Sequence, residues 1–116
     1  MYSLTADNKY YLYQGFVRMN LGINGLYKII RSQMTDLSPV CGDVFIFFGK
    51  KRQGVKILKW DGDGFLLYYK RLEGGSFELP VFNPHTGNYE IDYHVLTFIL
   101  NGVSLRSVRL RKRFRV

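Results

Sequence analysis

The sequence predicts an α+β domain in which an antiparallel sheet of about four to five short strands packs with two helices, followed by a basic C-terminal arm. Three observations favour this fold class. Short segments rich in Val, Ile, Phe and Tyr alternate with turns, two other segments carry apolar residues at helical spacing, and aromatic residues make up 16% of the chain. Disordered segments carry much less apolar surface, so the chain is expected to fold.

The 116 residues are enough for one domain, which we expect over residues 1–103, with residues 104–116 as a basic arm or a last strand. An aromatic segment over residues 10–16 predicts the first strand. Residues 20–34 predict an amphipathic helix, because Ile23, Leu26 and Ile30 recur on one helical face.

Four further strands are expected at residues 43–49, 54–61, 64–72 and 76–80. A parallel crossover needs about a dozen residues or more, and the connections between these segments are much shorter. They are therefore expected to form an antiparallel meander. A second helix is predicted over residues 90–100, ending at Asn101 and Gly102, before a tail that we expect to order on binding.

The sequence predicts neither a membrane-spanning helix nor a disulfide. The longest apolar runs have five residues, whereas a bilayer-spanning helix needs about 20. The N-terminal residues lack the pattern of a secretory signal, which predicts a cytoplasmic protein. Cys41 is the single cysteine, so it forms neither an intramolecular disulfide nor a cysteine-based zinc site, and we expect it to be a buried or half-buried apolar residue. No cofactor is expected.

Positive charge is concentrated in two segments. The formal net charge is +8, from 17 basic and nine acidic residues. The first segment contains Lys50, Lys51, Arg52, Lys56 and Lys59, and the second contains Arg106, Arg109, Arg111, Lys112, Arg113 and Arg115, with no acidic residue inside either. This asymmetry is typical of a surface that binds a polyanion, and nucleic acid is the leading candidate. A solvated surface is the alternative, while the lack of a basic amphipathic helix disfavours a membrane.

Lys70 and Arg71 add two bases to one predicted strand, where neighbouring side chains point to opposite faces. One of them could therefore join Lys56, Lys59 and the turn at residues 50–52 in a stripe that contacts phosphates. Ordinary solvent-exposed lysines are the competing interpretation. Trp60 and the tyrosines could stack on bases, although an aromatic side chain on a strand more often belongs to the core.

Asp61 and Asp63 are the candidate residues for an enzyme. A calcium loop would need Glu at position 72, which is Leu. A two-metal nuclease would need more clustered acids and a lysine from a neighbouring strand, for which only Lys59 or Lys70 could serve. Asp-Gly between two strands primarily indicates a hairpin turn. His85 and His94 have no third metal ligand nearby in the sequence, and no catalytic triad or P-loop is visible. The residues therefore give no argument for an enzyme.

Specific motifs follow in order along residues 41–80. After the basic turn at 50–52 come KILKWDGDGF at 56–65 and YKRLEGGSFELP at 69–80. Their order and spacing resemble the TnpB-type accessory protein, the second-open-reading-frame product, of the IS sixty-six insertion-sequence family. One departure is residues 17–21, which read VRMNL where the family usually has TDMRK, so a role of that charged motif is not carried over.

The resemblance implies a non-catalytic accessory protein that acts beside a separate transposase of the same element. Together with the charge pattern, it predicts binding to DNA, to the transposase, or to both, through the basic surface and the arginine-rich tail. Three alternatives stay open: an RNA- or single-strand-binding module, a metal-dependent nuclease using Asp61 and Asp63, and a purely protein-binding adaptor.

Overall fold

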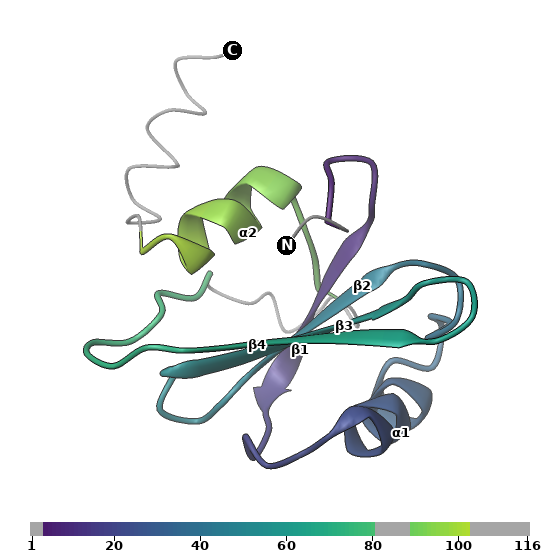
Figure 1. Cartoon of the computed structure of the whole chain (residues 1–116), viewed down its shortest axis with the longest axis horizontal. Coiled ribbons are helices and arrows are strands. Elements are labelled where there is room, and N and C mark those ends of the chain that lie inside the picture. Colours follow the sequence, from purple (N-terminus) through teal and green to yellow (C-terminus); the bar gives the residue numbers. More distant parts are fainter. Residues whose placement is uncertain (1–3, 81–88, 103–116) are drawn as a thin grey trace.

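A five-stranded sheet with one helix on each face forms the core of the protein (Figure 1). The computed structural model describes residues 4–80 and 89–102. The elements in chain order are β1 (Tyr10–Phe16), α1 (Ile23–Gln33), β2 (Val44–Phe48), β3 (Gly54–Trp60), β4 (Phe65–Arg71), β5 (Tyr89–Ile91) and α2 (Tyr93–Leu100). The strand order is β4-β3-β2-β1-β5. This confirms the predicted α+β class.

The sheet is antiparallel except at one pair of strands. β2, β3 and β4 form the predicted antiparallel meander, and β5 pairs antiparallel with β1. β1 instead runs parallel to β2, with Tyr10 opposite Val44. The connection between them contains α1 and is long enough for a crossover. Consequently, β1 and β2 end at the same edge of the sheet, which decides which loops lie close together.

β2 is the central strand, and its side chains alternate between two cores. All five of its residues are buried. Val44, Ile46 and Phe48 face one core cluster, which includes Leu96 and Ile99 of α2. Phe45 and Phe47 face the other cluster, which includes Leu26 and Ile30 of α1. A strand that is buried on both faces has a continuous run of apolar residues, and β2 has the sequence VFIFF.

One predicted strand and the start of one predicted helix were wrong. Residues 76–80 do not form a strand; Phe77 is 2% exposed and packs on the core cluster beside α2, while its backbone N–H donates to the Arg52 carbonyl at 2.6 Å. The second predicted helix is present, but its first two predicted residues, Glu90 and Ile91, belong to β5 (Tyr89–Ile91). α2 begins after Asp92, whose carboxylate caps it by accepting from the His94 backbone N–H at 2.9 Å.

The predicted domain boundary after residue 103 and the six basic residues of the tail lie outside the described residues. Within the described ranges, neither helix has the length and apolarity needed to cross a membrane.

Candidate nucleic-acid interface

The basic turn between β2 and β3 has a defined backbone. The backbone N–H of Gly49 donates to the Gly54 carbonyl at 3.1 Å, and the backbone N–H of Arg52 donates to the Gly49 carbonyl at 2.9 Å. Arg52 has a φ of 56°, in the left-handed region that reverses the chain, and its carbonyl accepts the bond from Phe77. The side chains of Lys50, Lys51 and Arg52 are exposed. The turn therefore presents three positive charges on a fixed loop.

The segment between β1 and α1 lies beside this turn. Val17 donates its N–H to the Phe48 carbonyl at 2.9 Å, which ties the segment to the end of β2. Met19 packs against the glycines that flank the turn: a Cβ on Gly54 would lie 2.6 Å from the Met19 sulfur. A Cβ on Gly54 would therefore displace the Met19 side chain from its present position. Arg18, between Val17 and Met19, is exposed.

β4 forms the third side of the same region. Tyr69 is 51% exposed and lies opposite Lys56 in the β3–β4 register. Lys56 is 8% exposed, and its ammonium donates to the Leu21 carbonyl at 2.6 Å while lying 5.1 Å from the centre of the Tyr69 ring. Arg71, two residues further along β4, forms an exposed ion pair with Glu73 at 3.1 Å.

These three elements enclose a groove of about 480 Å³. Its lining includes Arg18, Lys50, Lys51, Tyr69 and Arg71, and none of its lining residues, all of them in the described part of the chain, is acidic. We call this site the basic groove. Several like charges around one concave surface focus a positive potential that attracts anions. Phosphate groups are suitable ligands, because arginine binds them in a bidentate manner and lysine as a point charge.

The structure brings some of the predicted site residues to this groove and separates others. Lys50, Lys51 and Arg71 line it, and Arg52 lies in the same turn. Lys56 is buried beneath the surface and uses its ammonium within the fold, so we leave it out of the interface. Lys70 points to the other face of the sheet and donates to the Leu100 carbonyl at 2.7 Å. There its charge stabilises the C-terminal end of α2.

Arg18 is the groove residue that the sequence analysis missed. It is the second residue after β1, and it lies in the VRMNL segment where the chain departs from the family pattern. A parallel pairing of the first two strands would have placed it beside the basic turn, because parallel strands end at the same edge of a sheet. That pairing was not predicted.

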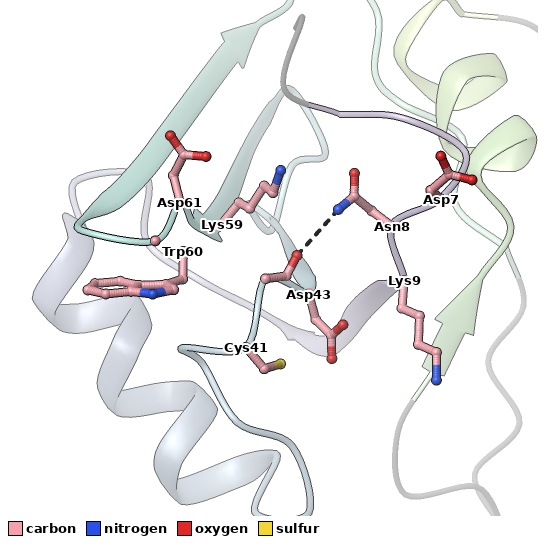
Figure 2. Close-up of a pocket in the computed structure, with 10 residues that line it drawn as sticks. Asp7, Asn8, Lys9, Cys41, Asp43, Lys59, Trp60 and Asp61 are labelled. Carbon is pink, nitrogen blue, oxygen red and sulfur yellow. Dashed lines mark hydrogen bonds between the residues drawn. The ribbon is translucent and has the colours of Figure 1, made fainter.

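Lys59 lies at the opposite end of β3, in a second pocket of about 630 Å³ (Figure 2). Figure 2 shows it with Asp7, Asp43, Asp61 and Lys9, so acidic residues outnumber basic ones here. The Asn8 side chain donates to the Gly42 carbonyl at 3.4 Å across this pocket. We call this site the acidic pocket. The predicted stripe from the turn to Lys59 is therefore divided between two ends of the sheet.

The turn between β3 and β4 forms one side of the acidic pocket. Asp61 donates its N–H to the Gly64 carbonyl at 2.7 Å and Gly62 has a φ of 86°, which confirms the predicted hairpin turn. Asp61 and Asp63 are both exposed, and no cluster of three potential metal-ligating side chains occurs in residues 4–80 and 89–102.

Cys41, also in the acidic pocket, is exposed, so the prediction of a buried or half-buried residue was wrong. Its thiol donates to the Ser38 carbonyl at 3.1 Å. Partial burial of the sulfur raises the pKa of the Cys41 thiol above its ordinary value, so the reactive thiolate is disfavoured.

Comparisons with known proteins place these features in a family context. The family model described as IS66 Orf2 like protein matches residues 8–110. The protein y4jC of Sinorhizobium fredii (strain NBRC 101917 / NGR234) is 39% identical over 59 residues, which cover 51% of this chain and 50% of that protein. The protein y4hO of the same strain is 31% identical over 74 residues, which cover 64% of this chain and 63% of that protein.

Both relatives are described as uncharacterized proteins. The matched part of this chain spans about half the length of the first relative and less than two thirds of the second. No solved structure matches the chain.

Proposed function

The chain belongs to the family of IS66 Orf2 like proteins, and on that premise we propose that it assists insertion-sequence transposition by binding DNA through the basic groove. The observation that carries this proposal is the convergence of Arg18, Lys50, Lys51 and Arg71 on one groove without an acidic lining residue. These residues come from three separate segments of the chain, so the concentration of charge is a property of the fold.

The groove has the chemistry of a phosphate-binding surface. Contacts to phosphates release counterions, and each contact contributes a slope of roughly −0.9 on duplex DNA and −0.7 on single strands to the dependence of log affinity on log salt. Such contacts position a protein on DNA without reading its sequence. A surface of this kind suits an accessory protein that holds element DNA beside a separate transposase.

The test measures binding of a labelled 30-base DNA, as duplex and as single strand, by fluorescence anisotropy across a salt series. The double variant Lys50→Ala/Lys51→Ala removes two charges from the groove. Lys28→Ala/Arg31→Ala removes two exposed charges from α1 as a matched control. We expect the groove variant to lose about two contacts, a slope change of roughly 1.4–1.8. We expect a much smaller change of slope in the control variant.

Equal losses in the two double variants would contradict a localised site. Absence of binding by the parent chain at low salt would contradict DNA binding altogether and favour a protein-binding adaptor. The family implies association with the transposition machinery in general. A pull-down of the transposase that persists after nuclease treatment would indicate a direct contact with it.

A further inference from the structure

Tyr69 is an unusual aromatic residue for this fold. Most of the aromatic rings on the sheet are buried or pack against another ring, as Tyr13 does with Phe47 and Trp60 with Phe65. Tyr69 instead is 51% exposed and lies in the wall of the basic groove. The half-exposed ring in the wall of a charged groove offers a flat apolar surface to a ligand that enters the groove.

The fold holds this ring in place from beneath. Lys56 is buried, its ammonium is anchored on the Leu21 carbonyl, and the same ammonium lies over one face of the Tyr69 ring, 5.1 Å from its centre. A cation in this position is attracted to the ring and fixes its orientation. The Tyr69 edge also lies beside Gly54, where a Cβ would make an ordinary van der Waals contact with the ring at 3.4 Å. The ring is therefore a preorganised flat surface.

We infer that the basic groove binds single-stranded DNA, with one unpaired base stacked on Tyr69 and the neighbouring phosphates held by Arg18, Lys50, Lys51 and Arg71. This rests on the proposed function and specifies its ligand. Single-strand binders combine a positively charged groove with aromatic side chains on which bases stack. Both parts occur here within one groove of about 480 Å³, a volume in the range that binds small organic groups.

A duplex fits this arrangement less well. Its base faces are stacked on one another inside the helix, out of reach of a ring set in the wall of a groove. A duplex would use the lysines and arginines while leaving Tyr69 without a partner. The tyrosine should therefore discriminate between the two forms of DNA, whereas the basic residues should serve both.

The experiment compares a 15-base single strand with the matching duplex, using the full-length parent and its Tyr69 variants. Tyr69→Ala should weaken single-strand binding about 5- to 150-fold, the equivalent of 1–3 kcal/mol per stacked base, and leave duplex affinity within about twofold. Tyr69→Phe keeps the ring and should bind like the parent. Phe16→Ala, which removes an exposed ring that does not line the groove, is the matched control and should have no effect.

A second readout reports stacking without relying on affinity. A 2-aminopurine base in the single strand should lose fluorescence on binding the parent or Tyr69→Phe and keep it with Tyr69→Leu, which retains an apolar side chain over Lys56. Melting temperatures verify that the variants are folded. If Tyr69→Leu binds and quenches like the parent, the stacking inference is wrong.

The possible failures are distinguishable. If Lys50→Ala/Lys51→Ala weakens binding but Tyr69→Ala does not, the proposed function stands and the single-strand inference is overturned. If neither affects binding, both are overturned. Tighter binding to RNA of the same sequence would overturn the choice of DNA.

Discussion

The two ends of the sheet differ in charge although the same strands form both. At one end, the basic groove collects Arg18, Lys50, Lys51 and Arg71. At the other, the acidic pocket contains Asp7, Asp43 and Asp61 with two lysines. Each end has an open pocket between loops. Only the first has a uniform sign of charge, so a general excess of basic residues does not explain it.

The difference shows that charge density along a chain is a poor guide to charge density on a surface. The segment from Lys50 to Lys59 carries five bases without an acid. Six residues of this segment, from Gly54 to Lys59, belong to β3 and span about 20 Å at the rise of an extended strand. This length places Lys59 at the acidic pocket, and side-chain alternation directs Lys56 into the packing under Tyr69. The groove is completed instead by Arg18 and Arg71, from distant parts of the chain.

The largest effect is expected from Lys56→Met, which removes the ammonium beneath the basic groove. The Leu21 carbonyl loses its donor, so we expect the free energy of unfolding to fall by about 1–3 kcal/mol. Lys9→Met, which removes an exposed ammonium at the acidic pocket, should change it by less than about 0.5 kcal/mol. Urea titrations measure both. Equal stabilities would show that the buried lysine does not hold the groove together.

The second prediction compares equal charge reversals at the two ends. Arg18→Glu and Lys9→Glu each lower the net charge by the same amount, but only Arg18 lines the basic groove. We expect Arg18→Glu to weaken DNA binding about tenfold, or 1.4 kcal/mol, and Lys9→Glu to weaken it less than about threefold. Anisotropy titrations at fixed salt give both values. Similar losses would mean that total charge, not the groove, governs binding.

Much of the fold could be predicted from the sequence because its central signals are local. The strands around Ile46, Ile57 and Leu67 and the helix through Leu26 have clear periodicity and clear turns, and all are present. The predictions were wrong where a residue is apolar because of a contact with a distant part of the chain and not because of the secondary structure around it. Phe77 is apolar because it packs on the core beside α2, not because it belongs to a strand.

Less of the site was predictable. Adjacent residues of the turn, Lys50 and Lys51, necessarily stay together, and alternation along a strand correctly separated Lys70 from Arg71. The place of Arg18 depends on the parallel pairing of β1 with β2, a long-range property that the meander pattern does not contain. The anchored position of Tyr69 likewise depends on a lysine that the sequence presents as one more surface base.

The third prediction concerns the start of β1, next to the acidic pocket. Tyr10 is 1% exposed, and its hydroxyl donates to the Thr5 carbonyl at 2.7 Å. Burial, with a smaller contribution from Tyr93, raises the pKa of Tyr10 from 10.0 to about 12. Folding therefore favours the protonated phenol. This stabilisation is complete below pH 10 and is lost as the pH rises toward 12.

We expect the urea midpoint of the parent to fall between pH 10 and pH 12. The urea midpoint of Tyr10→Phe should fall less steeply over the same range, because this variant has no phenol to ionise at position 10. Some slope should persist, since burial also raises the pKa of Tyr11. Absorbance of the tyrosinate at each pH follows the ionisation directly. An unchanged slope in Tyr10→Phe would show that Tyr10 is not responsible.

The smallest effect is expected from removing one acid next to each site. Glu73 pairs with Arg71 at the basic groove through a contact in which both side chains are mostly exposed, so a phosphate can compete for the arginine. Glu73→Gln should therefore strengthen DNA binding by about two- to threefold, well under the tenfold that corresponds to 1.4 kcal/mol. Asp61→Asn adds the same charge at the acidic pocket and should leave affinity nearly unchanged. DNA-binding titrations at low salt, where exposed charges are least screened, provide the comparison. If Asp61→Asn strengthens DNA binding as much as Glu73→Gln does, the net charge of the molecule governs affinity and the position of the charge does not.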